Sequence, residues 1–374
     1  MKASIPRRLV RTLCLFALTL SWPLAAAALA EAAEPVIGVN IVNPQWLPEA
    51  RQDQLLATLR ANGVQVIRVP LLAPYDRISR FIVQANAAGI RTVLNVYPSS
   101  DSFRPDAKRR PPVPDKPWIY AARGLSGVDP ERFRAFFAAY FSQMEARGVV
   151  FAGLELGNEI NWTPFNGDFP YPGEGRVFGE ADLERDPEAR IVAAGYQVYL
   201  RLLAVMKEVR DSSRLNRATP LISAGLADPG REGARPGPDA VAVGATLRYL
   251  RRQGLDRFVD AYAVHLYPAV QVSPERRRTH LRDELMAACG TDGGKPCWIT
   301  EWGLPAAGKD CPEDDSPRTP LMREMREDFR ALAREGRLTG LIYYPWEDRT
   351  NGIYRCGALT EAGRLALAPL ADGP

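Results

Sequence analysis

The stretch VQVIRVPLLAPYDRISRFIVQANAAGIRTVLNVYP, residues 64–98, decides the fold. Its two ends, residues 64–71 and 90–98, are apolar runs that predict strands, and residues 75–88 between them carry apolar side chains at helical spacing up to Gly89. Neither strand alternates cleanly between apolar and polar residues, which is typical of strands buried on both faces of a parallel sheet. The stretch is therefore predicted to be a strand–helix–strand unit with parallel strands.

The same alternation of a short apolar run and a longer amphipathic segment repeats along the chain. Eight strands are predicted, at residues 36–41, 64–71, 90–98, 149–161, 220–227, 259–268, 296–303 and 338–348. A helix is predicted after each strand, at residues 48–62, 75–88, 130–147, 187–212, 239–253, 274–288, 318–335 and 360–370. These repeats predict a closed (β/α)8 barrel, the TIM-barrel fold of the α/β class, as a single domain. The alternative, an open doubly wound sheet, would normally carry a glycine-rich turn after its first strand, and NIVNPQ at residues 40–45 offers none.

Residues 1–30 are predicted to be a secretory signal peptide rather than part of the fold. They combine a basic start, a short apolar run and small residues that end at Ala30. The basic residues are Lys2, Arg7, Arg8 and Arg11. An uncleaved amino-terminal anchor is the alternative, although the apolar run is short for a membrane span. The domain is then residues 31–374, secreted or periplasmic, with no membrane contact after signal cleavage.

Removing the signal changes the charge balance of the chain. The whole chain has 48 basic and 44 acidic side chains, and the four basic residues of the signal leave 44 of each. A balanced chain gives no support for binding to nucleic acid or to acidic membranes. We therefore expect no nucleic-acid partner, and we expect a monomer.

Four cysteines follow the signal, and an even number predicts two disulfides in an exported chain. Of the three possible pairings, Cys289 with Cys297 and Cys311 with Cys356 is favoured, because the first two flank the short loop GTDGGKP and could close a local bridge. Free buried thiols are the alternative. A zinc site is not expected, since the chain has two histidines and neither has ligand spacing to a cysteine pair. We expect no metal and no cofactor.

Polar residues collect where the predicted strands end, and in a barrel these ends surround one mouth, where the chemistry takes place. They are Arg68, Asn158, Glu159, His265, Tyr267 and Glu301. Glu159 and Glu301 lie on different strands of the ring. Two carboxyl groups across a cleft can hydrolyse a glycosidic bond, because one protonates the leaving oxygen while the other attacks the anomeric carbon or activates water. The simpler alternative is that both are capping or loop charges.

Four motifs on these strand ends make the sequence resemble a large clan of retaining glycoside hydrolases built on (β/α)8 barrels, which includes the cellulase-like family 5 and the xylosidase-like family 39. The motifs are IRVP at residues 67–70, GNE at 157–159, HLYP at 265–268 and TEWG at 300–303. The resemblance covers essentially all of the chain after the signal, because the motifs fall on the expected strands in the expected order.

The resemblance implies a role for each strand-end residue. Glu159 would be the acid/base and Glu301 the nucleophile, and Asn158 would hold the sugar 2-hydroxyl. Arg68 and Tyr267 would hydrogen-bond and orient Glu301, and His265 would line the cleft. Neighbours in a regular strand point to opposite faces, so Asn158 and Glu159 can both reach the mouth only if the strand ends or bulges there. Ile160 stands where many members have proline, which leaves the family within the clan open.

Tryptophans indicate a carbohydrate partner, because their flat faces stack on sugar rings. Those on or just after predicted strand ends are Trp46, Trp118, Trp162, Trp302 and Trp346. Trp298 lies inside a strand and is predicted to be core. Trp162, Trp302 and Trp346 are predicted to bind substrate, with Trp346 under the sugar at the cleavage point. Ordinary loop packing is the alternative for any single one of these tryptophans, and above all for Trp46 and Trp118.

The sequence thus predicts an exported retaining glycoside hydrolase that cleaves a β-linked poly- or oligosaccharide, such as a bacterial exopolysaccharide or a cell-wall glucan. The carboxyl groups of Glu159 and Glu301 should lie about 5–5.5 Å apart, whereas about 9 Å would imply inversion. The alternative is a non-catalytic or transglycosylating carbohydrate-binding barrel accessory to polysaccharide export. The sugar, the linkage and endo versus exo attack stay open, because they depend on loop shape.

Overall fold

The structure is a computed structural model that describes most of the chain. The described residues are 34–98, 103, 123–171, 173–229, 238–306, 311, 314–315, 317–348 and 350–371. The predicted signal peptide, residues 1–30, and Trp118 lie outside the described residues, so both expectations stay predictions.

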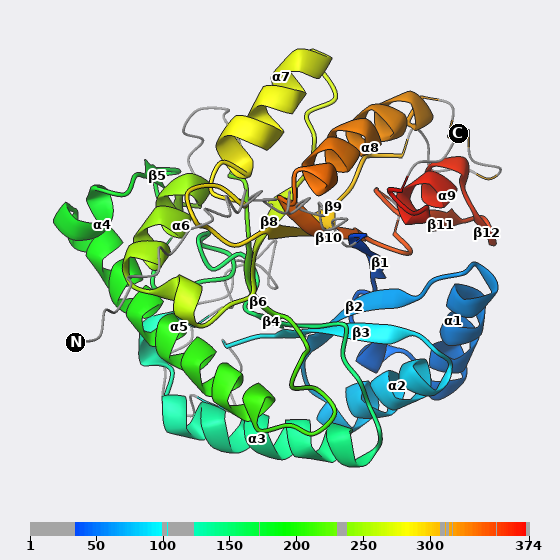
Figure 1. The fold of residues 1–374 in the computed structure, drawn as a ribbon, viewed down its shortest axis with the longest axis horizontal. Coiled ribbons are helices and arrows are strands. Elements are labelled where there is room, and N and C mark those ends of the chain that lie inside the picture. Colours follow the sequence, from blue (N-terminus) through cyan, green and yellow to red (C-terminus); the bar gives the residue numbers. More distant parts are fainter. Residues whose placement is uncertain are drawn as a thin grey trace, which may run out of the picture. The chain divides into compact units, whose positions relative to one another are not determined.

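Eight parallel strands form a closed barrel, which confirms the predicted (β/α)8 architecture (Figure 1). In their order around the ring the strands are β1 (Val36–Asn40), β10 (Leu338–Tyr343), β9 (Cys297–Trp302), β8 (Ala261–Leu266), β6 (Leu221–Leu226), β4 (Gly153–Leu156), β3 (Arg91–Val96) and β2 (Val66–Leu71). Each lies within a predicted strand. The ring closes where β1 and β10, the first and last barrel strands in the sequence, pair, with Val36 opposite Gly340 and Val39 opposite Tyr343.

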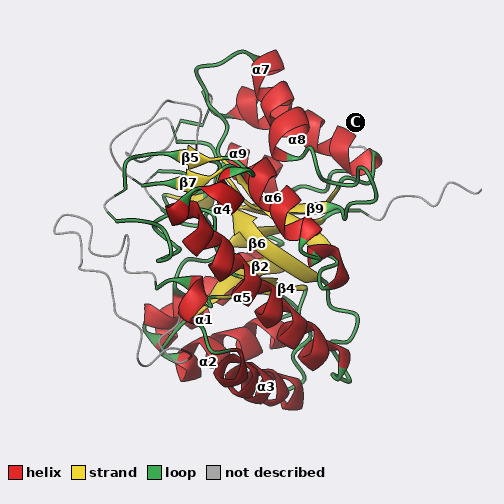
Figure 2. Ribbon diagram, turned by 90° about the vertical axis from the view of Figure 1, so that its left-hand side faces the viewer, coloured by secondary structure: helices red, strands yellow, loops and turns green. Residues whose placement is uncertain are grey.

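Helices follow the strands and pack around the barrel, as Figure 2 shows. They are α1 (Glu49–Ala61), α2 (Tyr75–Ala87), α3 (Pro130–Ala146), α5 (Pro187–Asp211), α6 (Val243–Arg252), α7 (Pro274–Thr279) with its π-helical continuation η5 (His280–Leu285), α8 (Thr319–Arg334) and α9 (Glu361–Leu367). A helix lies in each of the eight predicted ranges, but the range 239–253 was wrong at its start, where Ala240–Val241 form a short strand and the helix begins at Val243. α3 and α5 begin alike, since Asp129 and Asp186 each accept hydrogen bonds from two backbone N–H groups and a proline follows.

The connections carry short elements that the sequence did not predict. They are η1 (Pro44–Trp46), η3 (Leu125–Gly127), α4 (Asp182–Arg185), η4 (Leu255–Arg257), the strand pair β5 (Val177–Phe178) with β7 (Ala240–Val241), and the strand pair β11 (Tyr354–Arg355) with β12 (Ala358–Leu359). The β5–β7 pair joins the long connection after β4 to the connection after β6. A bridge from Trp162 to Ala240 ties the same two connections.

The core has two parts, as expected for a barrel surrounded by helices. The larger part packs the strands against the helices. The smaller part consists of Val66, Val93, Ala152, Ile222, Ala261, Ala263, Trp298 and Ile342. Trp298 is 2% exposed, which confirms its predicted place in the core. Gly340 makes room for it, because a Cβ there would lie 2.0 Å from the indole ring.

α5 is the one helix of the described residues that is long and apolar enough to cross a membrane by length and composition. In the fold, 67% of its apolar window is buried. The apolar residues of α5 therefore belong to the core between the helices and the barrel.

Both predicted disulfides are present. Cys289 is bonded to Cys297 and Cys311 to Cys356. The first bridge closes the short loop before β9, and the second joins two loops 45 residues apart in sequence. The favoured pairing is confirmed, and the alternative of free thiols is excluded for these four cysteines.

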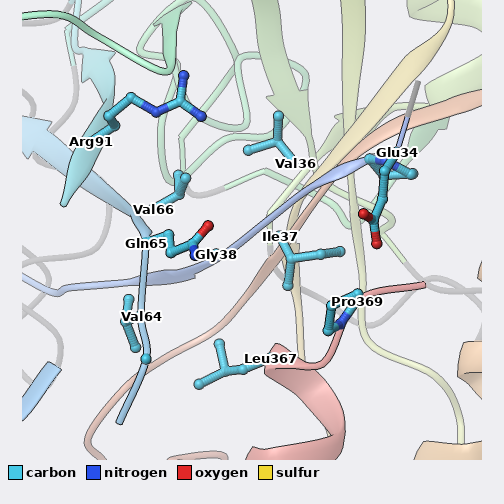
Figure 3. A pocket seen from close by; sticks show the side chains of 12 residues that line it. Glu34, Val36, Ile37, Gly38, Val64, Gln65, Val66, Arg91, Leu367 and Pro369 are labelled. Atoms are coloured by element: carbon cyan, nitrogen blue, oxygen red, sulfur yellow. The ribbon is translucent and has the colours of Figure 1, made fainter. Parts of the chain in front are cut away.

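A cavity of about 310 Å³ lies where the strands begin (Figure 3). It is lined by the starts of β1 and β2, by Arg91 at the start of β3 and by Leu367 at the end of α9. In (β/α)8 barrels the reacting groups sit at the carboxyl ends of the strands, which is the opposite end. This cavity is therefore not the candidate active site.

Candidate active site

Six of the residues predicted from the sequence meet at the carboxyl end of the barrel, and we call them the candidate site. They are Arg68, Asn158, Glu159, His265, Tyr267 and Glu301, and side-chain contacts connect all six. They come from β2, the turn after β4, the end of β8 and β9. Arg68 and His265 are buried inside this group, at 4% and 1% exposed.

The end of β4 explains how two neighbouring side chains reach the same site. The strand ends at Leu156, and Gly157 and Glu159 then adopt the left-handed backbone region, with φ of 89° and 46°. A glutamate in this region is unusual and indicates a backbone that its surroundings hold in place. The N–H of Glu159 donates to the carbonyl oxygen of Gly225 at 2.7 Å. The strand does end here, as the sequence analysis required for Asn158 and Glu159 to share one site.

Glu301 is held by two donors. Nη1 of Arg68 donates to its Oε1 at 2.7 Å, and the hydroxyl of Tyr267 donates to its Oε2 at 2.8 Å. The pairing of β8 with β9 shifts register here, because Val264 lies opposite Ile299 but His265 lies opposite Glu301. The shift inserts one extra residue on β9, which is the local irregularity that re-aims a strand side chain.

Glu159 contacts the imidazole of His265. Nδ1 of His265 lies 2.8 Å from Oε1 of Glu159 and 3.7 Å from Oε2 of Glu301. The far side of the ring faces Gly225, where a Cβ would lie 2.1 Å from Nε2. The ring is thus fixed between the two carboxyl groups and the backbone of β6.

The surroundings drive the two carboxyl groups toward opposite protonation states. Burial raises the pKa of Glu159, and this effect outweighs the hydrogen bond and charge of His265. Burial acts on Glu301 as well, but the charges of His265 and Arg68 and the hydrogen bond from Tyr267 outweigh it and lower its pKa. In such a pair, the carboxyl group that keeps its proton can act as a general acid and the ionised one as a nucleophile.

The groups beside the pair remain charged or proton-donating. Burial opposes the charge of Arg68, yet Glu155 and Glu301 outweigh it and raise the arginine pKa. Burial also opposes the charge of His265, but Glu301 and Glu159 outweigh it and raise the histidine pKa. Burial and Glu301 raise the pKa of Tyr267, which keeps its hydroxyl a donor.

The two carboxyl groups are close together. An oxygen of Glu159, a ring nitrogen of His265 and an oxygen of Glu301 all lie within 4.8 Å of one another. Such a set of donors could hold a metal ion. However, the guanidinium of Arg68 lies 2.7 Å from Glu301 and would repel a cation there. The set therefore suits proton transfer and nucleophilic attack better than metal binding.

The predicted tryptophans fare differently, and two expectations need correction. Trp302 is 0% exposed and packs edge-on against Phe329 of α8, so it faces the helices and does not line the site. The reason is the strand alternation, which turns the neighbour of Glu301 to the other face. Trp346 is 2% exposed and is stacked on Tyr354 at 4.9 Å, so it offers no open face to a sugar. Trp162 is half-buried beside Phe165.

Trp46 differs from these three, because it is 62% exposed on η1, directly after β1. The turn that carries it is anchored, since Nε2 of Gln52 donates to the carbonyl oxygen of Pro44 at 2.9 Å. Trp46 follows a predicted strand end but was not among the predicted substrate-binding residues.

Four further polar residues surround the candidate site without having been predicted. They are Asn40, Tyr97, Glu155 and Tyr344. Asn40 accepts a hydrogen bond from Nη1 of Arg68 at 2.9 Å. Burial and Glu301 raise the pKa of Tyr344, and the same two causes outweigh the charge of Arg68 at Tyr97. Asn40 ends β1, whereas Tyr97 and Tyr344 directly follow β3 and β10, so the strand-end criterion could have found these three.

Comparison with solved structures supports the fold. A structure described as one of two fungal β-1,4-galactanases has 15% sequence identity and a TM-score of 0.52, covering 88% of this chain and 93% of its own. A broad-specificity endoglucanase of family GH5-4 from an uncultured bacterium has 17% identity and a TM-score of 0.52, covering 89% and 93%. A GH1 β-glucosidase from Exiguobacterium antarcticum B7 has 11% identity and a TM-score of 0.53, covering 90% and 97%.

At these low identities the TM-scores show a shared architecture alone, the (β/α)8 barrel. No protein-family model matches the chain, and no curated protein matches it. The chemistry of the chain must therefore be argued from its own site.

Proposed function

We propose that the chain is an exported glycoside hydrolase that cleaves a β-linked poly- or oligosaccharide with retention of anomeric configuration. The observation that carries the proposal is the pairing of Glu159 with Glu301. One oxygen of Glu159 lies within 4.8 Å of one oxygen of Glu301, burial favours the protonated form of Glu159, and His265 and Arg68 favour the ionised form of Glu301. Retaining enzymes hold their two carboxyl groups about 5–5.5 Å apart, whereas inverting enzymes leave about 6.5–9.5 Å for a water molecule.

In the first step, the Glu301 carboxylate attacks the anomeric carbon while Glu159 gives its proton to the leaving oxygen. The bond from the anomeric carbon to the leaving oxygen breaks as the bond to Glu301 forms. The hydrogen bonds from Arg68 and Tyr267 hold the attacking carboxylate in one orientation, which favours a near-attack geometry.

In the second step, Glu159 is ionised and accepts a proton from water, which attacks the anomeric carbon and releases Glu301. His265 stabilises the ionised Glu159, because its Nδ1 lies 2.8 Å away and its pKa is raised despite burial. The proton balance then closes, since Glu159 ends the cycle protonated.

Asn158 is proposed to bind the sugar 2-hydroxyl. Its Oδ1 accepts a hydrogen bond from Nη2 of Arg68 at 2.8 Å, which fixes the amide and directs its NH2 group away from the arginine. A hydrogen bond to the 2-hydroxyl strengthens in the transition state of glycoside hydrolysis. Asn158 would therefore act on the reaction rate as well as on binding.

Two further observations support the proposal. The solved structures with the same architecture include a β-1,4-galactanase, a broad-specificity endoglucanase and a β-glucosidase, by their descriptions. The signal-like residues 1–30 and the two disulfides support an extracytoplasmic location, secreted or periplasmic.

The test is a screen of the purified chain on defined β-glucans, mannans, xylans, galactans and bacterial exopolysaccharides. Glu301→Ala is the blank, and the anomer released first is read by proton NMR. Sugar release by the wild type, absent in the blank and with the β-anomer appearing first, is expected. Equal release by Glu301→Ala would rule out the assigned nucleophile, and the α-anomer appearing first would rule out retention.

A further inference from the structure

Glu155 is a buried carboxylate in β4, four residues before Glu159, and the mechanism above does not use it. Its side chain is 0% exposed, and each of its oxygens accepts two hydrogen bonds. The four donors, from β2, β3, β9 and β6, are Arg68 Nε at 2.5 Å, Asn95 Nδ2 at 3.0 Å, Thr300 Oγ1 at 2.8 Å and the Gly225 N–H at 3.1 Å. A charge buried in a barrel interior is unfavourable unless it is paired and hydrogen-bonded, so this set of donors needs an explanation.

One consequence of these bonds is a fixed arginine. Arg68 donates from Nε to Glu155 and from Nη1 to Glu301, so a single planar guanidinium lies between two carboxylates. Because the guanidinium is rigid, fixing its Nε side also fixes the direction in which Nη1 points. Glu155 thereby determines how Arg68 meets Glu301.

A second consequence concerns the backbone on the acid side. The N–H of Gly225 donates to Oε1 of Glu155, while the carbonyl oxygen of Gly225 accepts the N–H of Glu159. Thr300, another donor to Oε1, directly precedes Glu301 on β9. Glu155 is thus hydrogen-bonded to Thr300, which precedes Glu301, and to Gly225, which holds the backbone of Glu159.

We propose that Glu155 is a positioning residue of this site, which fixes the Arg68 guanidinium against Glu301 and supplies its counter-charge. The inference rests on the proposed glycosidase function. Paired with Glu155, Arg68 orients Glu301 while much of its positive charge is balanced from the opposite side. Without Glu155, the arginine would bind Glu301 more strongly and make its electron pair less available for attack.

The counter-charge acts on a crowded group. Six other titratable residues interact electrostatically with Arg68 or Glu155. They are Tyr97, Glu159, Tyr199, His265, Glu301 and Tyr344. Removing one negative charge from this group favours the ionised form of both Glu159 and Glu301. Both carboxyl groups should then titrate at lower pH.

The experiment replaces the charge and keeps the shape, with Glu155→Gln. Two readouts are taken: kcat and KM against pH on the 4-nitrophenyl β-glycosides of glucose, galactose, xylose and mannose, and titration of Glu301 by 13C NMR of carboxyl-labelled glutamate. We expect kcat to fall about 10-fold or more, and we expect both limbs of the pH profile and the Glu301 titration to move down by roughly half to one pH unit.

A matched control is available in Asp328, a buried carboxylate on α8 that is paired with Arg278 at 2.6 Å. Asp328→Asn should leave the pH limbs and the Glu301 titration unchanged, even if it lowers the melting temperature. A charge-restoring variant, Glu155→Gln with Asn95→Asp, places a carboxylate on the side chain that lies 3.0 Å from Glu155. It should return the Glu301 titration toward its wild-type position.

The outcomes separate this proposal from the proposed function. An unchanged Glu301 titration in Glu155→Gln overturns the counter-charge, and an unchanged kcat in a wild-type enzyme that turns over overturns the positioning role. A lower kcat with unmoved limbs and no recovery in the double variant means that Glu155 is only structural, which also overturns it. If the wild type releases no sugar but Glu155→Gln moves the Glu301 titration, the glycosidase function fails and the link from Glu155 through Arg68 to Glu301 stands.

Discussion

Nδ1 of His265 lies 2.8 Å from Oε1 of Glu159, and the same nitrogen lies 3.7 Å from Oε2 of Glu301. The imidazole of His265 therefore lies beside both Glu159, whose protonated form is favoured, and Glu301, whose ionised form is favoured. The protonation states of the two glutamates are coupled through this contact, and the first three predictions follow from them.

The dependence of kcat/KM on pH should be bell-shaped. Glu301 must be ionised, so the rate rises with pH through its pKa, which His265 and Arg68 lower despite burial. Glu159 must be protonated, so the rate falls with pH through its pKa, which burial raises. The acid limb should therefore lie below the ordinary glutamate range and the alkaline limb above it. A profile that rises monotonically to alkaline pH would contradict the assignment of Glu159.

Glu159→Ala should lose activity in a way that depends on the leaving group. On a polysaccharide, whose leaving oxygen needs a proton, the rate should fall about 10²–10⁴-fold. On a 2,4-dinitrophenyl glycoside, whose leaving group is stable without a proton, formation of the glycosyl-enzyme should fall less than about 10-fold. The burst of dinitrophenol in stopped flow measures this step. Equal losses on both substrates would mean that Glu159 is not the acid.

Glu159→Gln should stabilise the folded chain at neutral and alkaline pH. The pKa of Glu159 is raised in the folded state, so its contribution to stability is fully present below the unfolded pKa and is lost as pH rises through the folded pKa. Glutamine keeps the shape and does not titrate. Its melting temperature should exceed that of the wild type by on the order of 2 °C at about pH 8, with the difference shrinking toward about pH 4. A difference that is constant over this range would argue against a buried titrating carboxyl group.

Gly225→Ala should disturb Glu159 indirectly, by displacing His265. A Cβ at this position would lie 2.1 Å from Nε2 of His265 and 2.6 Å from Oγ1 of Thr300, so the imidazole must move away from Glu159. We expect kcat to fall about 10–100-fold and stability to fall by about 1–3 kcal/mol.

The control for this glycine is Gly244→Ala on α6, where the nearest atom to a new Cβ is the flexible Nη1 of Arg248 at 3.1 Å. It should leave activity unchanged and change stability by no more than about 0.5 kcal/mol, because Gly244 is the second residue of α6 and its new Cβ meets only a flexible side chain. Activity assays and thermal unfolding of the two variants make the comparison. Wild-type kcat in Gly225→Ala would show that the position of His265 does not matter for the reaction.

Trp46→Ala should affect long substrates more than short ones. Trp46 is 62% exposed on an anchored turn after β1, and stacking on a sugar ring is worth about 0.5–1.5 kcal/mol beyond its buried area. KM for an oligosaccharide of about six sugars should rise about 3–10-fold, while kcat/KM on an aryl monoglycoside should not change. Trp46→Phe should retain part of the effect. A uniform loss on both substrates would assign Trp46 to loop structure instead.

The fold could be predicted almost completely, because each strand and each helix carries its signal locally. The eight strands lie within the predicted apolar runs, and the helices end close to glycines such as Gly89 and Gly148, which follow α2 and α3 with φ of 81° and 75°. The short elements escaped prediction. The pairing of β5 with β7 involves two residues from each of two connections, and no local pattern is long enough to indicate it.

The candidate site was predicted in part, and the misses have a common cause. The strand-end criterion found Glu159 and Glu301 because each follows an apolar run, but it does not specify the face to which a side chain points. Trp302 was therefore misplaced, since the shift that aims Glu301 inward leaves its neighbour among the helices. Glu155 escaped because it lies inside the strand. A charge in the apolar run GLELG was the available signal, since charged residues are seldom buried without a partner.

The pairing of β1 with β10 has a consequence for how the chain is made and moved. The first strand of the ring, beginning at Val36, finds its neighbour only when Leu338–Tyr343 is present, about three hundred residues later. Until then the sheet has two open edges, and Asn40 lacks the carbonyl oxygen of Tyr343 to which its amide donates. The closed ring therefore cannot form before the last strand has been made, and such non-local pairing is slow to form. In the proposed export of the chain, this late closure would keep the barrel from forming until the carboxyl end has been made.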